Sequence, residues 1–188
     1  MDAQTYSGDD DADMTTTDPE RDARARELEL LQRLEGIYAS GGLLTPADQA
    51  ALVVAAELES VSADAAFVAT LSEDGARIEV SRVTAASVAP ARLAFPINAP
   101  YPLAEVLRGQ TALVIASNEE LACDHPGLVR VDAADHACAT IPLRGTEGRL
   151  LGAMNLGFAN PRAFSESDRA AIQALGRRCA AALQAAQS

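Results

Sequence analysis

Two cysteine–histidine pairs are the residues of this sequence best suited to chemistry. Cys123 and His125 lie one residue apart, and His136 and Cys138 repeat that spacing in reverse order. Thiolate and imidazole are good zinc ligands, and residues i and i+2 of a strand share a face, so four donors could converge. Structural zinc sites use other spacings, and we expect no metal here. Cys138 is then a small hydrophobic residue in a strand, and His136 a polar residue at the strand's edge.

Residue types that are missing exclude several enzyme classes. All fifteen basic residues are arginine, so the lysine that a P-loop, a Schiff-base enzyme or a Ser-Lys hydrolase requires is absent. The sequence also lacks the Gly-x-Ser-x-Gly, His-Glu-x-x-His and Gly-x-Gly-x-x-Gly motifs. Three cysteines without paired spacing suit a reducing compartment. We therefore expect a cytoplasmic protein that is not an enzyme.

The charge distribution argues against nucleic acid as a partner. The formal net charge is −12, and residues 1–20 carry seven acidic residues and no basic one. An acidic protein repels the phosphate backbone. No apolar run approaches the roughly 18 residues that a membrane span requires, and no signal peptide is recognisable. We expect neither nucleic acid nor a membrane as partner.

The N-terminal composition predicts three successive regions. Residues 1–20 have almost no bulky apolar side chain and are predicted to form a disordered acidic leader. Residues 21–40 carry leucines at helical spacing and predict an N-terminal helix, which Gly41 and Gly42 end. Residues 44–188 are predicted to form one folded domain.

Local signals place the elements of that domain. Thr45, Pro46 and Asp48 form the capping signature of a helix that runs to about Ser60, and Ser165 with Asp168 caps the last helix in the same way. A short helix is predicted at 103–108, and residues 117–135 show no clear periodicity. Alternating or short apolar runs predict strands at 65–71, 77–83, 93–97, 112–115, 137–143 and 150–158.

This order of elements predicts the fold class. Hairpin-joined strands with helices at both ends favour a central antiparallel sheet of about six strands, flanked by the N- and C-terminal helices, over a parallel doubly wound fold. The class is therefore α+β. On the last helix, residues 172, 175, 179, 182 and 186 step by three and four, a stripe that could pack on the sheet or on a partner helix.

The C-terminal third closely resembles a GAF domain. The resemblance rests on the strand Ala137–Leu143, a Gly-bearing turn, the glycine-studded strand Leu150–Phe158 and the segment Asn160–Asp168 before the last helix. It extends more faintly upstream to Leu44. GAF domains are sensory modules, so the resemblance implies a protein that binds a small molecule or a partner. No output domain shares the sequence, so we expect signalling through another polypeptide. The ligand and any cofactor remain unidentified.

The resemblance also implies where a ligand would bind and how the chain would assemble. In this fold the ligand lies between the sheet and the irregular segment over one face, here 98–135. Phe95, Tyr101, Leu103 and Val131 would form an apolar wall, with Ser117, His125, His136 and Cys138 as polar contacts. A collapsed pocket that serves only as a docking scaffold is the alternative. GAF domains commonly pair through their terminal helices, which implies a homodimer.

One enzyme family uses this fold with catalytic cysteines, the free methionine-(R)-sulfoxide reductases. The Cys123-Asp124 step resembles part of its motif, but the Gly-Val-Cys-Gly segment and any tryptophan are absent. A thiol redox enzyme or redox sensor that uses Cys123 and Cys138 is therefore the alternative function.

Overall fold

The computed structural model describes residues 45–84, 87–130, 132 and 134–187, with the backbone alone described for residues 87–92. The predicted acidic leader (1–20), the predicted N-terminal helix (21–40) and Val131 lie outside the described residues. Within the described part, no helix is long and apolar enough to cross a membrane.

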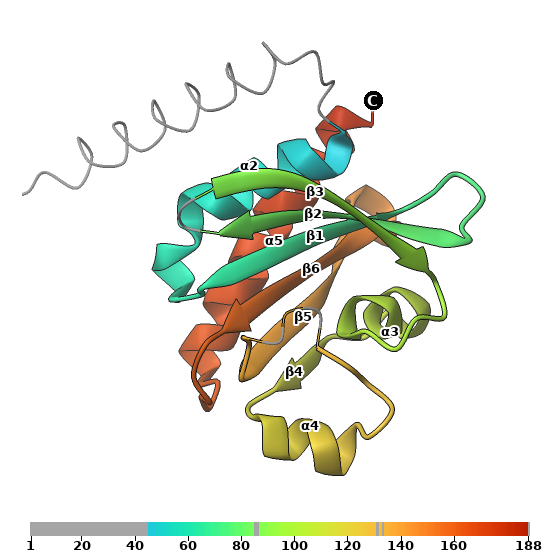
Figure 1. The fold of residues 1–188 in the computed structure, drawn as a ribbon. Coiled ribbons are helices and arrows are strands. Elements are labelled where there is room, and N and C mark those ends of the chain that lie inside the picture. The colour runs from blue at the N-terminus through green and yellow to red at the C-terminus, as the bar shows by residue number, and fades with distance from the viewer. Residues whose placement is uncertain (1–44, 85–86, 131, 133, 188) are drawn as a thin grey trace, which may run out of the picture.

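A six-stranded antiparallel sheet forms the centre of the fold (Figure 1). Its strands follow the order β3-β2-β1-β6-β5-β4, so the first and last long strands, β1 and β6, pair in the middle. The predicted α+β fold with a central antiparallel sheet is confirmed. The strands are β1 (Ala65–Leu71), β2 (Arg77–Thr84), β3 (Ser87–Pro96), β4 (Leu113–Ile115), β5 (Ala137–Arg144) and β6 (Leu150–Phe158).

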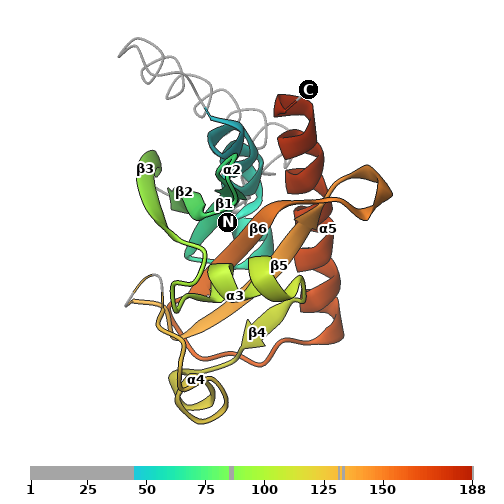
Figure 2. The ribbon, with the colours of Figure 1, turned by 90° about the vertical axis from the view of Figure 1, so that its right-hand side faces the viewer.

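Helices cover the two faces of the sheet unequally. The helices are α2 (Pro46–Glu57), α3 (Pro102–Gly109), α4 (Asn118–Asp124) and α5 (Glu166–Ala186), and two short 3-10 turns lie at Glu59–Val61 and Thr146–Gly148. The longest two, α2 and α5, lie side by side on one face, as Figures 1 and 2 show. The shorter α3 and α4 lie on the opposite side, with the segment that joins α4 to β5.

The capping signatures in the sequence form as predicted. The Thr45 hydroxyl accepts a hydrogen bond from the amide of Asp48 (3.2 Å), while the Asp48 carboxylate accepts one from the amide of Thr45 (2.9 Å). Asp48 is buried, and its second oxygen accepts a hydrogen bond from the hydroxyl of Ser81 on β2 (2.6 Å). The start of α2 is thereby fixed to the sheet as well as capped.

Strand β3 is longer than the sequence predicts. It begins at Ser87 instead of Leu93, and its pairing with β2 is interrupted by a bulge between Val80 and Arg82. Pro90 lies within it, which a central strand would not tolerate because proline cannot donate to the ladder. Since β3 is an edge strand, it accepts the proline.

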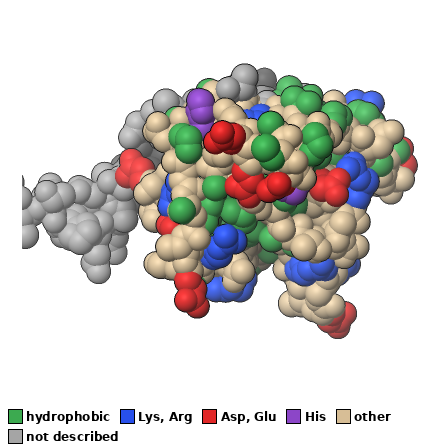
Figure 3. Space-filling model, turned by 90° about the horizontal axis from the view of Figure 1, so that it is seen from below, with side chains coloured by type: hydrophobic (Ala, Val, Ile, Leu, Met, Phe, Trp, Pro, Cys, Tyr) green, Lys and Arg blue, Asp and Glu red, His purple; other side chains and the backbone are tan. Residues whose placement is uncertain are grey.

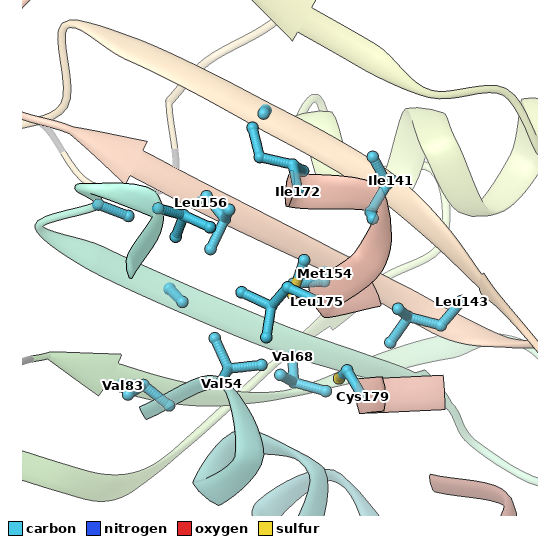
Figure 4. Packing of buried hydrophobic residues seen from close by; sticks show 14 of the residues in the cluster. Val54, Val68, Val83, Ile141, Leu143, Met154, Leu156, Ile172, Leu175 and Cys179 are labelled. Atoms are coloured by element: carbon cyan, nitrogen blue, oxygen red, sulfur yellow. The ribbon is translucent and has the colours of Figure 1, made fainter. Parts of the chain in front are cut away.

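The main hydrophobic core lies between the sheet and helices α2 and α5 (Figure 4). Val68, Met154 and Leu156 point to this face from the two central strands and are fully buried. Leu175 and Val54 meet them from α5 and α2. Complete burial of such a side chain stabilises the fold by about 1.5–3 kcal/mol relative to exposure.

The predicted stripe on α5 packs within the chain. Ile172, Leu175 and Cys179 are buried in the main core against α2 and the sheet, whereas Ala182 is only partly buried against it. Much of the stripe is therefore already covered, and the predicted homodimer would depend on other surface.

The predicted irregular segment 117–135 contains a helix, and this part of the prediction is wrong. Helix α4 begins after Ser117, whose hydroxyl accepts a hydrogen bond from the amide of Glu120 (3.1 Å). The Glu120 carboxylate in turn accepts one from the amide of Ala116 (2.6 Å). The helix has seven residues, none of them buried, so it lacks the apolar periodicity that reveals longer helices.

Candidate functional site

The sheet face opposite α2 and α5 changes from apolar to polar along its strands. Under α3 it carries Phe67 and Val80, which pack against Leu103 in a second hydrophobic cluster. One register row crosses the sheet from Arg82 through Phe67 and Asn155 to Thr140. Cross-strand partners in such a row share one face of the sheet. Polar side chains therefore flank Phe67 on this face, with Arg82 on one side and Asn155 and Thr140 on the other.

Asn155 and Thr140 form a buried polar pair at the centre of this face. Both side chains are almost completely buried, and the Asn155 amide donates to the Thr140 hydroxyl (2.6 Å). The neighbouring Cys138 is buried too, and burial raises the pKa of its thiol. The charge of the nearby Arg130 and hydrogen bonds of the sulfur with Asn155 and Arg130 offset this only in part. The thiol is therefore neutral at physiological pH.

Arg130 lies above this face, on the segment between α4 and β5, and two hydrogen bonds hold its side chain. Its Nε donates to the side-chain oxygen of Asn118 (2.6 Å), and its Nη2 donates to the backbone carbonyl of His136 (2.7 Å). The third nitrogen, Nη1, is buried and has no hydrogen-bond partner among the described residues. A guanidinium that is fixed at two positions presents its remaining donor in a defined direction.

Arg82 supplies a second guanidinium from β2. Its Nη2 forms an ion pair with Asp132 (2.5 Å), and its guanidinium carbon lies 5.9 Å from the centre of the Phe67 ring. Its Nε is also buried without a partner among the described residues. Buried donors in native proteins are nearly always paired, and leaving one unpaired costs about 1–3 kcal/mol.

Asp135 lies over β6, where a glycine makes room for it. A Cβ at Gly157 would lie 2.3 Å from both oxygens of the Asp135 carboxyl group, so any larger residue there would displace this side chain. Asp135 is 5% exposed. Burial and the neighbouring Asp132 raise its pKa to about 6, while Arg130 and Arg82 act in the opposite direction.

These residues form one group, which we call the polar patch. It combines two arginines with buried unpaired nitrogens, two aspartates and three buried polar or thiol side chains of the sheet. Its members are Arg82, Arg130, Asp132, Asp135, Cys138, Thr140 and Asn155.

Comparison with known proteins decides the family. A family model described as the GAF domain matches residues 45–184. The chain belongs to the GAF domain family. No curated protein matches it closely enough to serve as a relative.

Solved structures agree with the GAF fold at low sequence identity. The GAF domain of a phosphoenolpyruvate-protein phosphotransferase from Coxiella burnetii is 18% identical over 85% of this chain and 95% of its own, with a TM-score of 0.60. The second GAF domain of DevS from Mycobacterium smegmatis is 18% identical over 76% of this chain and 95% of its own (TM-score 0.57). The free methionine-R-sulfoxide reductase from Neisseria meningitidis, solved in complex with its substrate, is 14% identical over 100% of this chain and 98% of its own (TM-score 0.58).

Within this GAF domain, three of the predicted apolar residues lie on or next to α3. The rings of Phe95 and Tyr101 pack with their centres 4.8 Å apart, and Phe95 packs against the cluster that contains the fully buried Leu103. These residues fill the space between α3 and the sheet.

The predicted polar residues lie around α4 and the start of β5. Ser117 caps α4, and His125 follows the end of that helix. His136 is exposed, and its Nδ1 lies 3.1 Å from the side-chain nitrogen of Asn118. Figure 3 shows the face around α4, where histidine side chains lie beside acidic ones. Among the described residues, no three His, Cys, Asp or Glu side chains lie where they could share a metal ion.

A surface cleft of about 520 Å³ lies between α3 and the segment that follows α4. His125 lines it, together with Arg108, Leu113 and Leu128. None of the other predicted site residues that the structure describes lines this cleft, and it shares no residue with the polar patch. Arg108 is already bonded to Glu105 and to the carbonyl of Ile97 (2.5 Å each). We therefore take the polar patch as the candidate site.

Most of the polar patch was not predicted from the sequence. Only Cys138 was predicted, whereas Arg82, Arg130, Asp135 and Asn155 were not. A signal for Asn155 was present, because an asparagine within an otherwise apolar strand is unusual in a buried position. The arginines carried no comparable signal.

Proposed function

We propose that this GAF domain is a non-enzymatic sensory module that binds a small polar molecule at the polar patch. The observation that carries the proposal is the pair of buried guanidinium nitrogens, Arg82 Nε and Arg130 Nη1, without partners among the described residues. A patch that served only to stabilise the fold would have its donors satisfied, since unpaired buried donors are costly. A ligand that supplies the missing acceptors removes this cost.

The surroundings of the cysteines favour binding over catalysis. Burial raises the pKa of Cys138, and it raises that of Cys179 to about 12. Cys123 is exposed on α4, and no hydrogen bond between it and a histidine is present in the described part. A reactive cysteine needs a lowered pKa or an adjacent base. The thiol redox alternative is supported by the Cys123-Asp124 step and by the fold that this chain shares with sulfoxide reductases.

Native mass spectrometry of the purified full chain tests ligand binding. We expect an added mass that is retained under native conditions and lost on denaturation. Gly157→Ala should abolish the added mass, because the new methyl group displaces the Asp135 carboxyl group into the patch. Gly109→Ala is the matched control, since a Cβ there meets nothing within 4 Å. Retention of the ligand by Gly157→Ala would place it elsewhere.

Thiol titration before and after exposure to peroxide tests the alternative. We expect Cys123 to react first because it is exposed, and Cys138 and Cys179 to react only slowly. Rapid, peroxide-sensitive modification of Cys138 in the folded protein would favour a redox enzyme or redox sensor instead.

Signalling is proposed to pass through another polypeptide in the cytoplasm, from a homodimer. The three free cysteines are consistent with a reducing compartment. Because α5 already packs against α2 and the sheet, the dimer contact would fall to residues 21–40, which carry a predicted apolar stripe. Light scattering of the full chain and of a shortened chain that begins at Gly42 is the test. A monomeric full chain at tens of micromolar would contradict the dimer.

A further inference from the structure

The charges around the polar patch allow its ligand to be assigned to a chemical class. The two unpaired nitrogens belong to arginines, which remain protonated at all accessible pH values and can only donate hydrogen bonds. A cationic or purely donating ligand would leave both nitrogens unpaired and would be repelled by both guanidinium groups. An oxyanion pairs with them, and arginine is the side chain that binds carboxylate and phosphate groups most strongly.

The two guanidinium groups are already fixed in place for such a contact. Arg130 is held by Asn118 and by the His136 carbonyl, and Arg82 by Asp132 and by the Phe67 ring. The ligand would therefore not have to order either side chain, which normally costs about 0.5–1.5 kcal/mol for a flexible residue.

Asp135 decides how an anion could enter. Its carboxyl group lies over Gly157. Asp132 and Asp64 raise the pKa of this group, and Arg130 and Arg82 lower it. Two arginines and three aspartates leave this neighbourhood with a net charge of about −1 when every group is ionised. An incoming anion next to an ionised Asp135 would add like-charge repulsion, which protonation of Asp135 would remove.

We propose that the polar patch binds the oxyanion group of a small acidic molecule between Arg82 and Arg130, and that Asp135 takes up a proton as the anion binds. This inference rests on the proposed function, because it names the ligand class of that site. Carboxylates and sulfate- or phosphate-type groups share the required chemistry, and the experiment separates them.

The pKa of Asp135 makes this coupling observable near neutral pH. Since burial and Asp132 raise it to about 6, the carboxyl group is mostly protonated at pH 5.5 and mostly ionised at pH 7.5. If the anion binds only the protonated form, its apparent affinity falls with the protonated fraction. We expect binding about 25-fold tighter at pH 5.5 than at pH 7.5.

An NMR titration with sodium formate and sodium sulfate tests the proposal, because both anions keep their charge over this pH range. We expect saturable shifts of the Asn155 and Gly157 amide signals with at least one of them at pH 5.5. Arg130→Gln should abolish the shifts, and Arg82→Gln should weaken binding about tenfold, the loss expected from one charge-assisted hydrogen bond. Arg149→Gln, exposed in the turn at the far end of β5, is the matched control and should bind as the wild type does.

Asp135→Asn isolates the proton coupling. The variant should bind the anion with the same affinity at pH 5.5 and pH 7.5, because an amide keeps the shape of the side chain without titrating. If Arg130→Gln fails to fold, Arg82→Gln still tests the anion contact, and the comparison of the two pH values still tests proton uptake by Asp135.

Three results would overturn the inference: no saturable shift with either anion at pH 5.5, equal binding by wild type and Arg82→Gln, or an unchanged pH dependence in Asp135→Asn. If native mass spectrometry nevertheless finds a retained ligand that Gly157→Ala loses, the sensory proposal stands and only the ligand class is wrong. If neither experiment detects binding, both proposals fail.

Discussion

The two faces of the same sheet have opposite character. On the face covered by α2 and α5, most inward side chains of the central strands are apolar, and a polar contact between helix and sheet, from Ser81 to Asp48, is fully paired. On the other face, apolar packing extends only beneath α3. Beyond it lies the polar patch, which contains buried donors without partners.

This difference separates stability from recognition within one layer of strands. Because successive side chains of a strand point to opposite faces, the residues on one face can differ in character from those on the other. On β2, Val83 faces the helices while its neighbour Arg82 belongs to the patch. On β6, Leu156 faces the helices while its neighbour Asn155 belongs to the patch. A substitution on one face should therefore affect either the free energy of unfolding or the binding of the ligand, with little effect on the other.

The largest expected effect is on the helix-covered face. Leu175→Ala removes a fully buried side chain from the main core and should lower the free energy of unfolding by about 2–5 kcal/mol. Denaturant unfolding measures the loss, and Gln173→Ala on the exposed side of α5 is the control. Anion binding by the folded Leu175→Ala protein should be unchanged. A large loss of affinity would show that the two faces are not independent.

A smaller effect is expected from the buried polar pair. Asn155→Leu leaves the Thr140 hydroxyl without its partner and should cost about 1–3 kcal/mol. Adding Thr140→Val should restore much of the lost stability, because both polar groups are then replaced by apolar ones of similar size. A double-mutant cycle by denaturant unfolding measures this coupling. If the two losses simply add, the hydrogen bond does not explain the pair.

At neutral pH the ionised carboxyl group of Asp135 lowers the free energy of unfolding. The pKa of Asp135 is raised to about 6 from an ordinary value of 3.8, so the folded state disfavours the ionised carboxyl group. Its penalty is absent below about pH 3, where the group is protonated in both states, and reaches its full size above about pH 7. Asp135→Asn should therefore be more stable than wild type by up to about 3 kcal/mol at pH 7.5, with most of the gain lost at pH 4.

Denaturant unfolding at several pH values checks this sign, with Asp124→Asn on the exposed surface of α4 as the control. A gain that is the same at pH 4 and pH 7.5 would show that the carboxyl group of Asp135 is not the cause.

The sequence predicts those parts of the fold that local interactions determine. The caps formed by Thr45 with Asp48 and by Ser165 with Asp168 were predictable because each depends on residues three positions apart. The strands at 65–71 and 150–158 were predicted with the observed boundaries, since continuous apolar runs mark strands buried on both faces. Helix α4 was missed although Ser117 and Glu120 carry a capping signature, because it buries no apolar face.

The polar patch could not be predicted in the same way. Arg82, Arg130 and Asn155 are far apart in the sequence. The pairing of β1 with both β2 and β6 places Arg82 and Asn155 in one row, and the segment between α4 and β5 adds Arg130. That strand order depends on long-range contacts and not on local periodicity. The resemblance to GAF domains implied a site between the sheet and residues 98–135, but it pointed to none of the arginines and aspartates of the patch.

The smallest expected loss of stability comes from Ser165→Ala, and it too should leave anion binding at the other face unchanged. The Ser165 hydroxyl accepts a hydrogen bond from the Asp168 amide (3.1 Å) and donates to the Asp168 carboxylate (2.7 Å), so its loss should cost about 1 kcal/mol. Asp168 would keep its ion pair with Arg162 (2.6 Å), which packs over the Phe158 ring. The cap acts only through α5 and the main core, so thermal unfolding should show a lower melting temperature while formate and sulfate bind unchanged. Weaker anion binding in Ser165→Ala would mean that the position of α5 influences the polar patch through β5 and β6.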